Sequence, residues 1–147
     1  MKRRAFQISP RHRRILHVVS LVLLFSGAAW AWVHGLDEQG NAGVTLRDLK
    51  PWLMKAHGFA AVGFVLLLGT LLTTHIRRSW HARKNRSNGA FFLGAVSLLS
   101  ISGYALYYVG DETLRNAASQ LHLWLGLSSP ILLFWHIRSG RRATAAR

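Results

Sequence analysis

The stretch His122–Ile137, HLWLGLSSPILLFWHI, has a histidine at or next to each end of a run without Asp, Glu, Lys or Arg. About 20 apolar helical residues cross the hydrocarbon of a bilayer, so this run predicts a transmembrane helix. An ionisable side chain inside such a helix points to function, because hydrocarbon gives it no water. The fourteen residues from His122 to His136 correspond to about 21 Å of helix, so both imidazoles lie on nearly the same face at two depths.

Three further windows of similar length also lack Asp, Glu, Lys and Arg. Together the four windows predict transmembrane helices over residues 15–36, 52–76, 88–110 and 116–138. We therefore expect an all-α, integral membrane four-helix bundle that forms a single domain over residues 1–147. Pro51 suits the first turn of the second helix, and Pro130 is expected to kink the fourth.

The charge of the chain is +14, and its distribution indicates topology. Most Lys and Arg residues lie in the N-terminal arm, the middle loop and the tail, whereas all five acids lie in the other two loops. Under the positive-inside rule both termini and the middle loop face the cytoplasm. We therefore expect membrane lipid, and not nucleic acid, as the partner of the basic residues. These are Lys2, Arg3, Arg4, Arg11, Arg13 and Arg14 in the arm, Arg77, Arg78, Arg83, Lys84 and Arg86 in the loop, and Arg138, Arg141, Arg142 and Arg147 in the tail.

A cleaved signal peptide is an alternative interpretation of the first window. Basic residues precede its apolar run, and Ala29-Trp30-Ala31 resembles a cleavage site. The apolar run is, however, longer than that of an ordinary signal peptide, which favours a retained helix.

The histidines form a pattern at two depths. At the outer depth, His57 near the start of the second helix matches His122 near the start of the fourth. At the inner depth, His17, His75 and His136 lie close to basic residues. Two haems stacked across the membrane, each held by two imidazoles from two helices, explain this pattern, and the absence of Cys excludes thioether attachment. His136 is level with His17, whereas His75 lies about one turn deeper, so His17 is preferred and His75 is the alternative.

Glycines are expected to make room for a macrocycle among these helices. Ordinary close packing of membrane helices explains such residues equally well. The glycines concerned are Gly58, Gly63, Gly69, Gly94, Gly103 and Gly126.

Four stretches resemble the cytochrome b561 superfamily of bacterial four-helix di-haem proteins: RRILHVV (13–19), HGFAAVGFVLLLG (57–69), SISGYALYY (100–108) and LHLWLGLSSPILLFWHIRSGRR (121–142). That group includes formate dehydrogenase gamma subunits, nickel-iron hydrogenase cytochrome b subunits and superoxide-oxidising cytochromes. The resemblance implies two non-covalent, bis-histidine haem b groups in a multi-pass protein of the bacterial inner membrane. The outer haem would be held by His57 and His122, the inner by His17 and His136, and His75 would line a quinone pocket. Val18 departs from the family, which commonly has an aromatic residue there.

Three functions follow as hypotheses. The first is an electron-transfer subunit that links an outer-face partner, such as a catalytic subunit or a soluble cytochrome, to quinone or an inner-face partner. The second is a stand-alone enzyme that oxidises superoxide or reduces a small acceptor, with quinone as the other substrate. The third is a structural subunit or metal transporter without haem, because several cytoplasmic-side histidines could bind zinc or copper. Those histidines are His12, His17, His75, His81 and His136.

Overall fold

The computed structural model describes residues 8–83 and 85–145, and every regular element in these ranges is helical. The elements are α1 (Pro10–Glu38), α2 (Val44–Leu71), the π-helical turn η1 (Leu72–Ile76), α3 (Arg77–His81), α4 (Arg86–Tyr108) and α5 (Glu112–Ala145). Of these, α1, α2, α4 and α5 are long and apolar enough to span a membrane. The prediction of an all-α, multi-pass membrane chain is thereby confirmed. Some residues of the charge pattern lie outside the described ranges, namely Lys2, Arg3, Arg4, Lys84 and Arg147.

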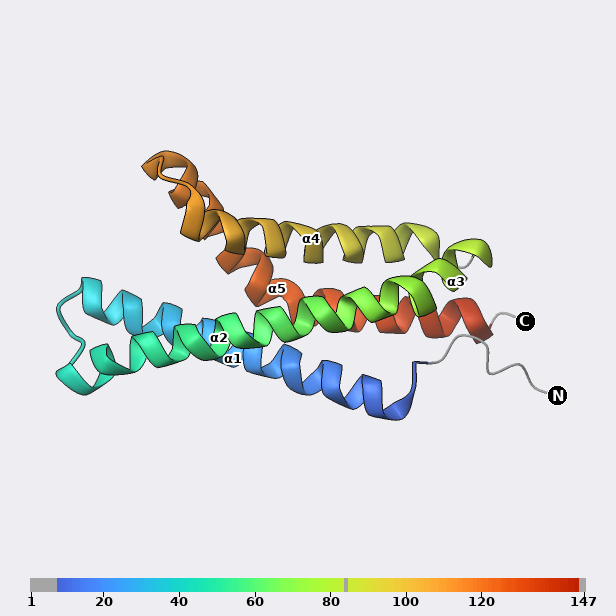
Figure 1. Ribbon diagram of the computed structural model, residues 1–147, viewed down its shortest axis with the longest axis horizontal. Coiled ribbons are helices and arrows are strands. Elements are labelled where there is room, and N and C mark those ends of the chain that lie inside the picture. Colours follow the sequence, from blue (N-terminus) through green and yellow to red (C-terminus); the bar gives the residue numbers. More distant parts are fainter. Residues whose placement is uncertain (1–7, 84, 146–147) are drawn as a thin grey trace. The chain divides into compact units, whose positions relative to one another are not determined.

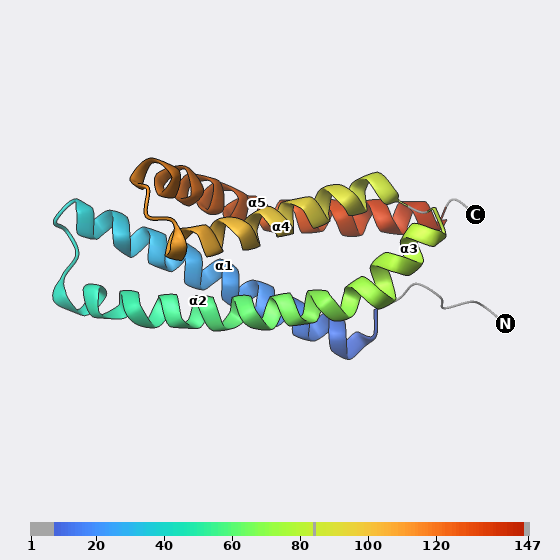
Figure 2. The ribbon, with the colours of Figure 1, turned by 45° about the horizontal axis from the view of Figure 1, so that its top comes forward.

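The chain divides after Leu72 into two compact units. The first unit pairs α1 with α2, and the second pairs α4 with α5 (Figures 1 and 2). Each unit is a helical hairpin, because its two long helices are antiparallel and joined by a short turn.

Contacts along the first unit establish its antiparallel register. Near the turn, the Asp37 carboxylate lies 2.6 Å from Nε of Arg47 and 3.0 Å from Nζ of Lys50. At the opposite end, Nε2 of His12 lies 3.0 Å from the Thr70 hydroxyl. A salt bridge that is partly exposed contributes little stability alone, but two cations on one carboxylate hold the start of α2 against α1.

Contacts along the second unit establish an antiparallel register for α4 and α5 as well. The Ser139 hydroxyl donates to the side-chain oxygen of Asn85 over 2.8 Å, at the end of the hairpin far from the α4–α5 turn. Nearer that turn, a Cβ placed on Gly126 would lie 3.8 Å from Leu99. In Figure 1, α5 changes direction where its colour passes from orange to red, the part of the chain that holds Pro130. The missing N–H and the ring of a proline inside a helix account for such a bend.

All four long helices begin before their predicted windows because charged residues are also good helix formers. Helix α1 begins at Pro10, where Ser9 caps it by accepting a hydrogen bond from the backbone N–H of His12 over 3.2 Å. The placement of Pro51 in a first turn is wrong, since α2 begins at Val44 and Pro51 lies in its interior. The ion pairs of Asp37 with Arg47 and Lys50 hold the segment before Pro51 against α1.

The surfaces of the long helices suit lipid. Large apolar side chains are exposed along them, with Phe59 86% and Ile131 71% accessible. The buried apolar residues of the described ranges are small: Val33, Ala42, Ala60, Ala95 and Val96. Small residues at helix contacts with large ones facing outward are typical of membrane helices, where lipid covers the outer face.

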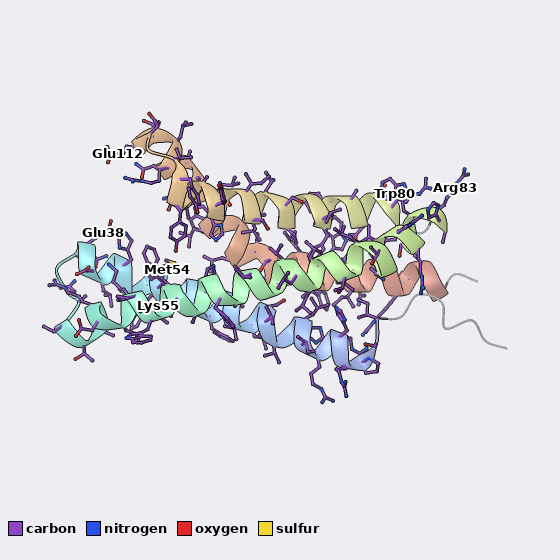
Figure 3. The ribbon with its side chains drawn as sticks, in the orientation of Figure 1. Glu38, Met54, Lys55, Trp80, Arg83 and Glu112 are labelled. Carbon is purple, nitrogen blue, oxygen red and sulfur yellow. The ribbon has the colours of Figure 1, made fainter. Side chains whose placement is uncertain are left out.

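Opposite charges gather at opposite ends of each unit. In the second unit, Arg83 and Trp80 lie at one end of α4 and Glu112 at the other (Figure 3). In the first, Glu38 lies at the turn between α1 and α2, far from the arginines at the start of α1 (Figure 3).

Shortening Val33 tests the packing of the first hairpin. Val33 is only 1% exposed, so Val33→Ala removes packed atoms and should lower the free energy of unfolding in detergent by about 1–2 kcal/mol. Val65→Ala is the matched control, because Val65 is 50% exposed on α2 and should change stability far less. Equal losses from both variants would contradict the packing described for α1.

Candidate functional site

The imidazole of His57 on α2 is held by α1. Its Nδ1 lies 3.0 Å from the carbonyl oxygen of Leu23 and 3.1 Å from the hydroxyl oxygen of Ser26. A carbonyl oxygen only accepts, so Nδ1 must carry the hydrogen. The Ser26 hydroxyl has one hydrogen of its own and directs it to backbone carbonyl oxygens of α1, to Val22 over 2.5 Å and to Leu23 over 3.3 Å. The neutral ring is therefore the tautomer whose lone pair is on Nε2.

The imidazole of His122 on α5 is held by α4 in the same manner. Its Nδ1 lies 3.1 Å from the carbonyl oxygen of Leu99 and 3.0 Å from the hydroxyl oxygen of Ser102. Ser102 donates its hydrogen to the carbonyl oxygen of Leu99 over 3.1 Å. The second unit therefore also presents the Nε2 lone pair of a histidine.

A glycine follows each serine and makes room for the ring. A Cβ on Gly27 would lie 3.0 Å from Cε1 of His57, and a Cβ on Gly103 would lie 3.1 Å from Cε1 of His122. Both distances are shorter than an ordinary van der Waals contact, so no larger residue fits without displacing the imidazole. We call the arrangement of leucine carbonyl, serine hydroxyl and glycine around each ring a histidine cradle.

The serines of the two cradles are the buried polar residues of the described ranges. Ser26 is 7% exposed and Ser102 is 3% exposed. Burial of a hydroxyl is costly unless it is hydrogen-bonded, and both are bonded to a helix carbonyl and to an imidazole.

His136 on α5 has a different partner. Its Nδ1 lies 2.8 Å from the side-chain oxygen of Asn88, and its ring stacks on Phe92 with centroids 4.8 Å apart. The amide of Asn85 lies 3.4 Å from the same oxygen of Asn88. Because the amide oxygen accepts the hydrogen of Nδ1, His136 also carries its lone pair on Nε2.

His75 lies in the π-helical turn η1 and in the same unit as His136. Its Nδ1 is buried and has no hydrogen-bond partner among the described residues. A buried ring nitrogen without a partner costs about 1–3 kcal/mol, and π-turns occur frequently at functional sites.

The remaining predicted ligand, His17, lies exposed on α1 in the first unit, which also holds His57. The second unit holds His75, His122 and His136. The structure thus groups the five predicted histidines by unit, two in the first and three in the second.

His34 near the turn of the first unit has the opposite tautomer. Its Nδ1 lies 3.2 Å from Nζ of Lys50, which can only donate, and its Nε2 lies 3.4 Å from the carboxylate of Glu38. Its ring also stacks on Trp30 with centroids 4.7 Å apart. His34 thus has a structural role at the turn end of the hairpin and differs from the histidines predicted as ligands.

No three His, Asp or Glu side chains gather as a metal-binding group within residues 8–83 and 85–145. The histidines proposed for a zinc or copper site, His12, His17, His75, His81 and His136, include none of the cradled rings.

Sequence reasoning missed the cradle residues Leu23, Ser26, Gly27, Leu99 and Ser102, and also Asn88. It expected Gly103 to admit a macrocycle, whereas the residue lies against the His122 ring. The sequence contains a pattern that could have identified most of these residues, because Leu-x-x-Ser-Gly occurs at 23–27 and again at 99–103. In both halves of the chain the motif lies in the helix that precedes the one carrying the cradled histidine.

Comparison of the chain with protein-family models, with curated proteins and with solved structures finds no match. The resemblance to the cytochrome b561 superfamily therefore depends on the residues quoted above.

Alanine substitution of the cradle glycines tests the geometry. In an open helix position Gly→Ala stabilises by about 0.5–1 kcal/mol, whereas overpacking costs about 1–3 kcal/mol. Gly27→Ala and Gly103→Ala should therefore leave stability unchanged or lowered and should shift the Cε1–H resonance of His57 or His122. The control Gly63→Ala, with nothing within 4 Å of its added Cβ, should be stabilised without any such shift. Unshifted ring resonances in both cradle variants would exclude the close contacts.

Proposed function

We propose that this chain is a membrane cytochrome b that holds two haem b groups and transfers electrons across a bacterial inner membrane. The observation that supports this proposal best is that His57, His122 and His136 have the same tautomer. Each donates its Nδ1 hydrogen to a fixed oxygen and so carries its lone pair on Nε2.

This state is the one that iron ligation needs. A histidine that binds a metal through one ring nitrogen almost always donates the hydrogen of its other nitrogen to a carbonyl or similar acceptor. That bond fixes the tautomer and the ring orientation. The residues present therefore fit axial ligation, with His57 and His122 proposed for the outer haem.

For the inner haem we propose His136 together with His17. The exposed ring of His17 on its own hairpin is accessible to a cofactor, and Nδ1 of His136 is already bound to Asn88. His75 lacks the satisfied Nδ1 that His122 and His136 have. We assign His75 to a quinone site, where a quinone oxygen would supply the missing hydrogen-bond partner, with iron ligation as its alternative role.

Haem would supply one-electron redox chemistry, and the chain would position it. The imidazoles fix where the two irons lie along the membrane normal, and the apolar helices exclude water around them. The four central apolar windows, residues 15–36, 56–76, 88–110 and 116–137, contain no Asp, Glu, Lys or Arg. Such windows favour electron transfer over the conversion of a polar substrate.

The charge distribution indicates which end of each hairpin faces the cytoplasm. Basic residues at one end of each hairpin, and acidic residues at the other, favour cytoplasmic termini with His57 and His122 toward the outer face. The acidic outer turns would then face a partner subunit or a soluble cytochrome, and quinone would bind near the inner end.

The optical spectrum of the purified chain tests the proposal. Protein expressed with haem available should show two low-spin b haems per chain, quantified as the pyridine haemochrome before and after dithionite. A folded chain without haem would overturn the electron-transfer function.

Ligand variants assign the haems. His57→Ala and His122→Ala should each remove the same single haem, and His136→Ala should remove the other. His34→Ala is the matched control and should retain both, because the His34 ring is held by Lys50 and Glu38. Loss of different haems from His57→Ala and His122→Ala would contradict the shared outer site.

His17→Ala and His75→Ala distinguish the two roles at the inner site. Loss of the inner haem from His17→Ala, with both haems retained in His75→Ala but slower reduction by quinol, supports the assignment. Loss of the inner haem from His75→Ala alone would transfer iron ligation to His75.

A further inference from the structure

We infer that Ser26 is a positioning residue for His57, and Ser102 for His122. Each serine raises the electron-donating strength of Nε2 in its own histidine, and the two effects are equal. The inference rests on the proposed function, because it concerns those histidines as ligands of one iron. It assigns to the serines a role in the reduction potential in addition to their contribution to structure.

The carbonyl oxygens of Leu23 and Leu99 would already fix the tautomer of each ring. Each serine adds a second acceptor for the same N–H, with oxygen distances of 3.0 and 3.1 Å at both histidines. The serine hydrogen is directed to a helix carbonyl, so the oxygen lone pair faces the imidazole. Each Nδ1–H is therefore shared between two oxygens.

Helix stability does not explain these serines. Alanine is the better helix former, and replacing both a hydroxyl and its partner by apolar groups is often neutral. With alanine at either serine position the helix would form equally well, so helix formation does not require the hydroxyl.

Acceptors on Nδ1–H raise the basicity of the opposite nitrogen. A more basic axial ligand stabilises ferric over ferrous iron and so lowers the reduction potential. Since both cradles have the same acceptors at nearly the same distances, the outer haem would receive this effect from both axial sides. His136 has an amide acceptor and an aromatic neighbour, so the inner haem would have a different potential.

The first measurement uses the haem-free chain in detergent. Nitrogen-15 correlation spectra should show His57 and His122 as Nδ1–H tautomers. Ser26→Ala should shift the Nδ1–H proton of His57, and Ser102→Ala that of His122, both upfield as expected for a weaker hydrogen bond. Ser26→Thr and Ser102→Thr keep the hydroxyl and should restore the resonance. Ser100→Ala is the matched control, because Ser100 lies on α4 and its hydroxyl donates to the carbonyl oxygen of Val96 over 3.0 Å.

The second measurement uses the haem-loaded chain. Each serine-to-alanine variant should raise the midpoint potential of the outer haem alone and weaken haem binding about tenfold. The two variants should shift it in the same direction and by similar amounts, and Ser100→Ala should leave it unchanged.

The outcomes separate the two proposals. A wild-type chain that never binds haem overturns the proposed function and the tuning role together. A loaded chain whose Nδ1–H resonances and outer potential are the same in both alanine variants overturns the tuning role alone. A shift from only one of the two variants overturns the equivalence of the halves.

Discussion

An imidazole inside hydrocarbon needs a hydrogen-bond partner from the protein, because lipid supplies none. In each hairpin this requirement is met from the neighbouring helix: α1 supplies the acceptors for His57, and α4 supplies those for His122. In each hairpin one acceptor is a helix carbonyl oxygen, which has a second lone pair available, and the other is a serine hydroxyl. These hydrogen bonds fix the tautomer of each ring and help to hold the two helices of each hairpin in register. They also account for the glycine that lies against each ring.

The four long helices could be predicted because the bilayer imposes their minimum length on the sequence. Runs without ionised residues marked their centres, but the boundaries were missed. Ser9 and Pro10 start α1 before the apolar window, and Pro51 is tolerated inside α2 where Asp37 holds the preceding turn. These ends depend on capping and on contacts between helices, which hydropathy does not report.

The histidines were predictable as a group, and their cradles were not. A lone serine in an apolar run usually bonds its own helix, as Ser100 and Ser128 do here. Only the pairing of α1 with α2, and of α4 with α5, reveals that Ser26 and Ser102 also face a ring. The triplet His-Ile-Arg occurs at 75–77 and again at 136–138, but the two copies are not equivalent, because His75 lies in a π-turn and His136 in regular α-helix. The Leu-x-x-Ser-Gly repeat is the one that corresponds to equivalent contacts.

Because every cradle is completed within one hairpin, the orientation of each ring needs nothing from the other half of the chain. A helical hairpin is also a natural unit for insertion into a bilayer during synthesis. The first hairpin can therefore leave the ribosome with its outer imidazole already fixed, before the second exists. The conformational entropy of the two rings is lost during folding, so it does not weaken the later capture of a ligand. Each half of the chain thus prepares its own imidazole, in the order that the direction of translation sets.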